Sequence, residues 1–527
     1  MAGLLNDTLN STPVLVILVL VIVWRLSAAF RRKSVLESLP VPSGAEFVWG
    51  HEKQVFMNEP GQAYRKWKSE LGLTYRIKAA FGAPDILVLS DPVSIAYILQ
   101  KKIYDYHHSR VVRPRVARLL GKGLGWVEGE AEHKRMRRLV SPSLSPENVK
   151  AMSSDVRVAA LEVVDQFVSH VQSGAEKPVN ILDWTSKATL NVIGRVAFLH
   201  DFQAGNSPEA KQILGGRRRG VSRAAKYAGF LTLMLLRRFP ILNDLPIAAI
   251  QSQGLAKVAI QTGVARELIR RNQDIVKNGD TKVSKDLLSR LLVAHAAGDI
   301  SEEELYEQIS TFIVSGHETT TQTLGFTIYE LSRHPEIQAK LREELAAVKG
   351  EPTYDDFQAR LPYLEAVLRE TLRLYPGLPY IERVATVPDS IPLGEPVKLS
   401  NGEVVSQIPV LPGQVVVIPC IAIHRMDSVW EDPDVFRPER WLKDLPASEK
   451  LCSGWANTLA FSDGPRNCVG YRLAIFQYKV ILTYLLERFK FEDAGMDITL
   501  KIASSLQAWV KDRPELGGCL PVNVDLL

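Results

Sequence analysis

Cysteine is scarce in this sequence: the chain of 527 residues has only four, Cys420, Cys452, Cys468 and Cys519. Four scattered cysteines cannot cross-link a fold of this length, which excludes a disulfide framework and favours a reducing compartment. Long runs of one charge are missing as well, because 64 Lys and Arg are interleaved with 59 Asp and Glu. We therefore expect no nucleic-acid partner.

Internal repeats and low-complexity linkers are also missing after residue 45, so we expect one catalytic domain over residues 45–527. Apolar residues at spacings of three and four predict many helices, whereas β-prone runs are few. The expected class is mainly α with small β-sheets (α+β). The predicted helices cover residues 148–172, 186–199, 256–277, 302–333, 335–348 and 361–374, and the predicted strands lie near residues 74–81, 85–90, 396–400 and 414–420.

The N-terminus contains an apolar stretch that predicts a membrane anchor over residues 13–30. Its strictly apolar part is shorter than the roughly 20 residues of a spanning helix, but Arg25 can reach the headgroups and lengthen the span. A basic cluster and a proline hinge follow at residues 31–44, and residues 1–12 would be lumenal. A cleaved signal peptide is the alternative, which the basic flank after the apolar run disfavours.

A second apolar stretch, residues 230–236, is flanked by Lys226 and by Arg237 and Arg238. This pattern fits a patch that touches a membrane surface, and it fits an ordinary core helix equally well.

The densest chemical signal is the segment FSDGPRNCVG at residues 461–470, directly before a strongly helical stretch. The free N–H groups and the positive end of a helix would stabilise a thiolate at Cys468, as a soft metal ligand requires. Gly464 permits a tight turn, Gly470 permits close helix packing, and Arg466 offers a fork for a carboxylate. A buried structural cysteine and a nucleophilic cysteine are the alternatives, and the ten-residue pattern disfavours both.

This segment resembles the proximal loop of the haem-thiolate monooxygenases, the cytochrome P450 superfamily, whose pattern F-x-x-G-x-R-x-C-x-G it matches at every specified position. The resemblance implies haem b (iron protoporphyrin IX) as the cofactor and Cys468 as the axial ligand of its iron. It also implies that Phe461 shields the sulfur, that Arg466 pairs with a haem propionate, and that Gly464 and Gly470 belong to the cofactor-binding loop.

Glu370 and Arg373 are spaced by three residues in the helical stretch LPYLEAVLRETLRLYP. Such pairs are common on solvated helices and mean little alone. In context, the stretch resembles the E-x-x-R helix of the same family, and residues 436–441 resemble the loop that supplies Arg440. The resemblance implies a buried charge network with a structural role, because removing one member would leave an uncompensated charge.

Residues 311–320, TFIVSGHETT, form an apolar helix that turns small and polar at its centre. Gly316 would let a flat cofactor approach the backbone, while Glu318 and Thr319 supply an acid and a hydroxyl for relaying protons. The segment resembles the oxygen-activation motif of the family, with Ser315 in place of the usual Ala or Gly. The resemblance implies catalytic roles for Glu318 and Thr319 in delivering protons to bound dioxygen.

His133 and Arg137 resemble the W-x-x-x-R helix of the family, with His in place of Trp, and Arg383 lies where a propionate-binding arginine is expected. The resemblance implies that all three contact the cofactor. A solvated basic helix face is the alternative for the first two, and that face could also dock an acidic redox partner.

Two other segments resemble a nucleotide-binding loop and a zinc-binding motif but lack residues that these motifs require. Gly121–Gly125 is rich in glycine but fits neither the dinucleotide fingerprint nor the phosphate loop, and Thr321 stands where a zinc motif beginning at His317 needs its second histidine. Without a nucleotide site of its own, the chain needs electrons from a separate protein. We expect NADPH-cytochrome P450 reductase, with cytochrome b5 as a second candidate donor.

The anchor and the family-like segments occur in the order and spacing of this family over nearly the whole chain. The resemblance implies a fungal enzyme of the endoplasmic reticulum membrane with a cytosolic catalytic domain, which uses dioxygen to oxidise a small hydrophobic molecule. A terpenoid of secondary metabolism is the first candidate substrate, and fatty acids and aromatic polyketides stay open. The alternatives are a same-fold enzyme that rearranges peroxides and a membrane-tethered haem carrier or sensor.

Overall fold

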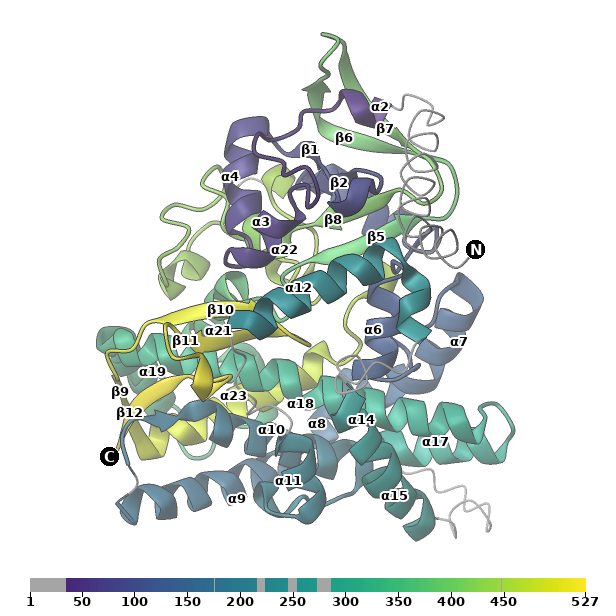
Figure 1. Ribbon diagram of the computed structural model, residues 1–527. Coiled ribbons are helices and arrows are strands. Elements are labelled where there is room, and N and C mark those ends of the chain that lie inside the picture. Colours follow the sequence, from purple (N-terminus) through teal and green to yellow (C-terminus); the bar gives the residue numbers. More distant parts are fainter. Residues whose placement is uncertain (1–34, 175, 216–222, 245–253, 273–285, 447) are drawn as a thin grey trace, which may run out of the picture.

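The computed structural model describes residues 35–174, 176–215, 223–244, 254–272, 286–446 and 448–527 (Figure 1). Figure 1 shows a sheet-rich part, built from the N-terminal segments and from strands late in the chain, and a larger helical part below it. Helix α12 (Arg223–Arg238) runs between the two parts.

The sheet-rich part is built on a mixed five-stranded sheet with the strand order β1-β2-β8-β5-β3. Only β2 and β8 are parallel, with Leu87 opposite Val416. All four residues of β2 are buried, so the sheet is covered on both faces. The strands are β1 (Thr74–Ile77), β2 (Ile86–Leu89), β3 (Tyr106–His107), β5 (Ile381–Ala385) and β8 (Val415–Ile418).

The helical part is centred on α18 (Glu302–Arg333), which begins with a capping box between Ser301 and Glu304. Nearly every residue of α18 after Leu305 is buried, including a run of threonines. Hydroxyls at these positions donate to carbonyls one turn back, as Thr321 does to His317 at 2.8 Å, and so need no water. The helices around α18 include α9 (Ser153–Gln172), α10 (Ile181–Phe198), α17 (Leu287–Ala296), α19 (Pro335–Ala346), α21 (Pro362–Leu374) and α23 (Tyr471–Arg488).

Shorter elements complete the two parts. The remaining helices include α2 (Val35–Ser38), α3 (Glu52–Met57), α4 (Gln62–Leu71), α5 (Pro92–Ala96), α6 (Val112–Leu119), α7 (Glu130–Val140), α8 (Pro146–Ala151), α11 (Pro208–Gly215), α14 (Leu255–Ala259), α15 (Ala265–Arg271), α20 (Tyr354–Ala359) and α22 (Cys420–Ile423). The small sheets pair β10 (Ile498–Ile502) with β11 (Leu506–Val510), β12 (Pro521–Leu526) with both β4 (Val179–Asn180) and β9 (Phe489–Asp493), and β6 (Asp389–Lys398) with β7 (Val404–Val410).

The predicted class, mainly helical with small sheets, is confirmed, and each predicted helix has a counterpart. Helix α10 begins five residues earlier than expected, at Ile181, because the Asn180 side chain accepts from the Leu182 N–H and caps it. The predicted strand at residues 396–400 is the end of a longer strand, β6.

No helix in the described part of the chain is long and apolar enough to cross a membrane. The predicted lumenal segment at residues 1–12 and the predicted anchor at residues 13–30 lie outside the described residues.

The expectation for Gly316 is wrong. A Cβ built on Gly316 would lie 2.6 Å from Cγ1 of Ile193, so this glycine allows α10 to approach α18 closely and does not face a cofactor. Ile193 is only 3% exposed and has little room to move away. The small residue in the centre of α18 is therefore a packing feature.

Replacing Gly316 by alanine should destabilise the protein by about 1–3 kcal/mol, the usual cost of overfilling a packed core. The cost of Gly316→Ala should be smaller when it is measured in an Ile193→Ala background, because the atoms that the new methyl group overlaps are then absent. Urea unfolding measures both. Gly229→Ala in α12 is the matched control, because no atom lies within 4 Å of the added Cβ; equal stability of the Gly316 and Gly229 variants would contradict this account of the packing.

Candidate active site

Cys468 lies three residues before the first residue of α23, in a loop closed by its own N–H, which donates to the Phe461 carbonyl at 2.9 Å. Its side chain is exposed, although burial among protein atoms raises the pKa of the thiol. The sulfur is therefore accessible but surrounded by many protein atoms, as expected for a group that faces a space inside the protein. A hydrogen bond from the Gly470 backbone and the charge of Arg137 lower the same pKa and so favour a thiolate.

The glycines of this loop act differently from one another. Gly464 has φ of +67°, and a Cβ there would lie 2.1 Å from the Leu99 carbonyl oxygen, which agrees with the tight turn expected. A Cβ on Gly470 would meet no atom within 4 Å, so the expectation that Gly470 permits close helix packing is wrong. Phe461 packs edge-on against Trp455, with ring centroids 5.3 Å apart, and so holds the start of the loop.

Arg466 reaches from this loop to the segment before α7. Its Nη2 donates to the Val127 carbonyl at 2.8 Å and to Glu128 at 3.1 Å. Burial raises the pKa of the Glu128 carboxyl, but hydrogen bonds from His108 and the charge of Arg466 outweigh this effect and bring the pKa to about 2. Burial and the nearby Arg383 charge lower the pKa of His108 to about 4, so its imidazole is neutral near pH 7.

Arg383 on β5 is a second guanidinium near Arg466. Burial, followed by the repulsion from Arg466, lowers its pKa to about 10. Its one hydrogen bond within the described residues is from Nη1 to the Glu382 carbonyl at 3.1 Å. Arg383 is thus a partly buried cation with little compensation from protein groups, and a nearby anion would stabilise it.

The two residues of α7 that are predicted to contact the cofactor have different hydrogen-bond partners. Arg137 donates to the carbonyl of Asn467 at 2.7 Å and to its side chain, so it clamps the residue next to Cys468. His133 is buried, and its Nδ1 lies 3.1 Å from the Tyr104 hydroxyl. Burial, with help from Arg466 and Arg137, lowers the pKa of His133 to about 4. The alternative of a solvated basic face therefore does not describe these two residues.

These residues fit a haem. The sulfur of Cys468 is exposed, and Arg137 interacts with it. Arg466, two residues before Cys468, acts on Arg383, and Glu128 is the carboxylate that acts on both of these arginines. The Nε of Arg466 is buried without a hydrogen-bond partner among the described residues. A group that carries a metal ion and two carboxylates would satisfy both the sulfur of Cys468 and the guanidinium groups.

The predicted charge network around Glu370 is assembled in full. Both Glu370 and Arg373 are completely buried, and their side chains form two hydrogen bonds of 2.8 and 2.9 Å. Arg440 donates to Glu370 at 3.0 Å, and so does the indole of Trp441. Burial raises the pKa of Glu370, but these donors outweigh it and lower the pKa below its usual value.

His424 joins this network to the cysteine loop, a role that the sequence analysis did not find. Its carbonyl accepts from Arg373 at 2.9 Å, and its Nε2 accepts from the Leu459 N–H at 2.8 Å. Burial and the neighbouring Arg373 charge lower the pKa of His424 to about 3, so the ring stays neutral and keeps its acceptor. No local motif marks such a histidine, because its partners are distant in sequence.

The predicted catalytic pair on α18 has contacts on two sides. The Thr319 hydroxyl donates to the Ser315 carbonyl at 3.4 Å, and Thr319 packs beside Gly377 after α21. Glu318 is 7% exposed, and its carboxylate accepts hydrogen bonds from Ser504, Ser505 and Gln507. These three residues lie in the turn between β10 and β11 and at the start of β11, which the sequence analysis did not connect with α18.

Comparison with known proteins agrees with this geometry. The chain belongs to the cytochrome P450 family, because the family model described as Cytochrome P450 matches residues 40–514. It is similar to Cytochrome P450 monooxygenase 205 of Postia placenta, with 30% identity over 510 residues that cover 93% of each chain. Cytochrome P450 monooxygenase claQ of Ampulloclitocybe clavipes is 30% identical over 497 residues, 91% of each chain. The predicted family and enzyme class, a cytochrome P450 monooxygenase, are confirmed.

Replacing Glu370 by alanine should destabilise the protein by about 3–5 kcal/mol, because Arg373 and Arg440 would remain buried without their counter-charge. Denaturant unfolding of the purified protein measures this loss. The matched control is Glu267→Ala, which breaks a pair of the same spacing with Arg270 on the exposed face of α15 and should leave the midpoint unchanged. Similar losses in both variants would show that burial of the Glu370 network is not the cause.

Replacing Arg383 by leucine should act in opposite directions on two measurements. The haem-free protein should become more stable, because a partly buried and poorly compensated charge is removed. Haem retention should weaken by about tenfold to a hundredfold, which corresponds to a lost hydrogen bond between charged groups. Thermal melting and haem transfer to apomyoglobin give the two values, with Arg270→Leu on the surface as the control; unchanged haem retention would contradict the role of Arg383.

Proposed function

We propose that this protein is a haem-thiolate monooxygenase that inserts one oxygen atom of dioxygen into a small hydrophobic molecule and reduces the other to water. The observation that carries this proposal is the position of Cys468, whose side chain is exposed and interacts with Arg137. Two residues before it lies the buried guanidinium of Arg466, which in turn acts on the partly buried Arg383. The family match over residues 40–514 supports it. We assign the catalytic domain to residues 45–527, after the hinge at residues 31–44.

Haem b, held through Cys468, would supply the iron at which dioxygen is activated. Residues of the chain would fix its position: Cys468 would bind the metal, and Arg466 and Arg383 would pair with the propionates. Arg137 would act on the cofactor indirectly, because its hydrogen bonds to Asn467 hold the loop that presents the sulfur. His133, which contacts the Tyr104 hydroxyl, is a further proposed contact of the cofactor.

Glu318 and Thr319 on α18 are the proposed groups that would deliver protons to the bound dioxygen. Adjacent positions on a helix differ by about 100° in direction, so the carboxylate and the hydroxyl point to different surroundings. Thr319 would hydrogen-bond dioxygen, and Glu318 would bring protons from the hydrogen-bonded side of α18. The contacts of Glu318 with Ser504 and Gln507 support this division.

Electrons would come from NADPH-cytochrome P450 reductase, with cytochrome b5 as a candidate second donor. The main sheet of the described chain is mixed and mostly antiparallel, unlike the parallel sheet that binds dinucleotides. Lys134, Arg135 and Arg138 on α7 lie on the helix that clamps the cysteine loop. They would offer cations to an acidic partner, although Lys134 and Arg135 also pair with acids of the chain.

The proposed location is the endoplasmic reticulum membrane, with residues 13–30 as a single anchor. In the stretch at residues 230–236, Phe230 and Met234 are buried as in a core helix, while Leu231 and Leu235 are exposed and leave contact with a membrane open. The exposed apolar side chains on and near α12 would rest on the membrane surface. They are Phe47, Val48, Tyr227, Leu231, Leu235, Phe239 and Ile241.

A terpenoid or another secondary metabolite is the proposed substrate. Relatives such as Cytochrome P450 monooxygenase claQ come from fungi, which agrees with the fungal enzyme that the resemblance in the sequence implies. Phe312 and Ile381 are apolar and lie on α18 and β5, the elements that carry Thr319 and Arg383. The sequence suggests two further apolar contacts for a substrate, Ile313 and Leu378. Ile313 is completely buried and is not proposed as a contact, whereas Leu378 is 56% exposed and stays a candidate.

The decisive experiment is the absorption spectrum of the reduced, carbon-monoxide-bound protein in yeast microsomes. The wild type should show the Soret band of a thiolate-bound haem, and Cys468→Ser should lose it. Cys452→Ser is the matched control, because Cys452 is a buried cysteine within the hydrophobic core of the sheet-rich part and should keep the band. A folded wild type without haem would refute the proposal.

A further inference from the structure

A polar cavity of about 320 Å³ is lined by residues of α10, α11, α18 and β11 and by the short connections next to them. The described residues that line it include none from α7, β5 or the cysteine loop at residues 461–470. Cavities that bind small organic molecules usually measure about 300–1,000 Å³. This cavity is therefore a separate place in the molecule that is large enough for a small ligand.

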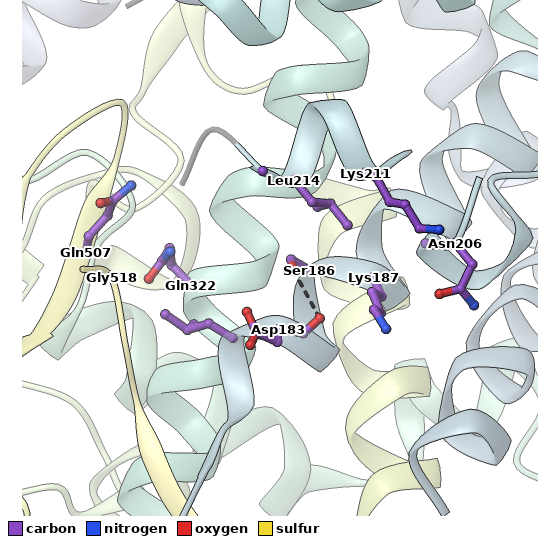
Figure 2. Close-up of a pocket in the computed structure, with 12 residues that line it drawn as sticks. Asp183, Ser186, Lys187, Asn206, Lys211, Leu214, Gln322, Gln507 and Gly518 are labelled. Carbon is purple, nitrogen blue, oxygen red and sulfur yellow. Dashed lines mark hydrogen bonds between the residues drawn. The ribbon is translucent and has the colours of Figure 1, made fainter. Parts of the chain in front are cut away.

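The buried part of the cavity wall offers hydrogen-bond acceptors. Gln322 is 4% exposed, and its Oε1 accepts no hydrogen bond from any residue that the structure describes. Ser186 is also buried, and its hydroxyl donates to the Asp183 carbonyl at 3.3 Å (Figure 2), so only its lone pairs are left for another molecule. A buried amide oxygen without a donor costs free energy. The wall therefore favours a molecule that brings hydrogen-bond donors.

The opposite side of the cavity is cationic. Figure 2 shows Lys187, Lys211 and Asn206 across the cavity from Gln322. Lys211 and Asn206 are exposed, so this side opens to solvent and gives a ligand a way in. Two ammonium groups against the single carboxylate of Asp183 leave the lining with a net positive charge. Such a lining attracts anions.

The side chain of Lys187 is held in place before any ligand arrives. Its Nζ lies 4.5 Å from the centre of the Trp184 ring, and a Cβ built on Gly205 would lie 2.5 Å from its Cγ. The ammonium is thus fixed over an aromatic face, and the glycine backbone packs closely against the carbon stem. A group that is already ordered loses little conformational entropy when it binds an anion.

We propose that this cavity binds a small organic acid that carries hydroxyl groups. Its carboxylate pairs with Lys187 and Lys211, and its hydroxyls donate to Gln322 and Ser186. Leu182, which is 6% exposed, lines the cavity between these polar groups and contacts the carbon chain. Water alone would satisfy Gln322 but would bring no negative charge to the lysines. The cavity is separate from the cysteine loop, so this inference stands or fails independently of the proposed function.

The first test is calorimetric titration of the full-length protein with three probes, threonate, ribonate and gluconate. We expect at least one of them to bind with a Kd of about 1 mM or lower. Two matched probes have the carbon chain of gluconate: hexanoate keeps the carboxylate without the hydroxyls, and glucitol keeps the hydroxyls without the charge. Each should bind about tenfold more weakly than gluconate, because each lacks one of the two sets of hydrogen bonds.

The second test repeats the titration with variants of the lining. Gln322→Leu, Lys187→Met and Lys211→Met should each weaken binding by about tenfold, the factor expected from losing one strong hydrogen bond. Lys150→Met is the matched control, because Lys150 pairs with Asp355 on an exposed surface away from the cavity, and it should bind like the wild type. Urea unfolding of ligand-free Gln322→Leu should show no loss of stability, because this change removes a buried acceptor that has no donor.

Three results would overturn this inference. If none of the three hydroxy acids binds, the cavity holds water only. If hexanoate or glucitol binds as tightly as gluconate, the assigned ligand class is wrong. If binding is the same in the wild type and in all three lining variants, the ligand sits elsewhere on the protein. Because Lys211 is exposed, Lys211→Met tests the role of the charge even if Lys187→Met does not fold.

Discussion

The carboxylate of Glu370 is the group on which much of this structure depends. It is completely buried and accepts from Arg373, Arg440, Trp441 and the Arg437 backbone. Removing a charge from water is costly, and only a full set of donors offsets that cost. The donors come from α21 and from the segment after α22 that contains the short 3-10 helix Pro438–Leu442, so segments distant in sequence are held in one arrangement. Through His424, the same arrangement extends to Leu459 and the loop that carries Cys468.

A second buried cluster is built in the opposite way. Near the cysteine loop, Arg137 acts on the thiol and Arg466 acts on Arg383, while Glu128 offsets the charges of Arg383 and Arg466 only in part. The protein alone gains no stability from this arrangement, since burial and mutual repulsion lower the pKa of Arg383. The first cluster is neutralised within the protein, whereas the second needs an anionic guest. This contrast separates the structural residues from those that hold a cofactor.

Much of this was predictable from the sequence because the signals were local. Cys468 and Arg466 lie in one ten-residue motif, and Glu370 and Arg373 share one helix turn. His424, Glu128 and Ser504 carried no such signal, since each acts through a partner that the fold brings near: Ser504 contacts Glu318 from almost two hundred residues away in the chain. Gly316 and Gly470 show a different kind of error, because each lies in a recognised motif but its surroundings were predicted wrongly. Gly316 packs against Ile193 and not against a cofactor, and Gly470 has no close neighbour.

The pairing of β2 with β8 bears on how the protein is made. Leu87 pairs with Val416, so the central strand of the main sheet cannot be added until more than three quarters of the chain has left the ribosome. At about 5–20 residues per second, β2 waits on the order of tens of seconds with an unpaired and apolar edge. During this interval the nascent chain would need a chaperone or an adjacent surface to keep that edge from pairing with another chain.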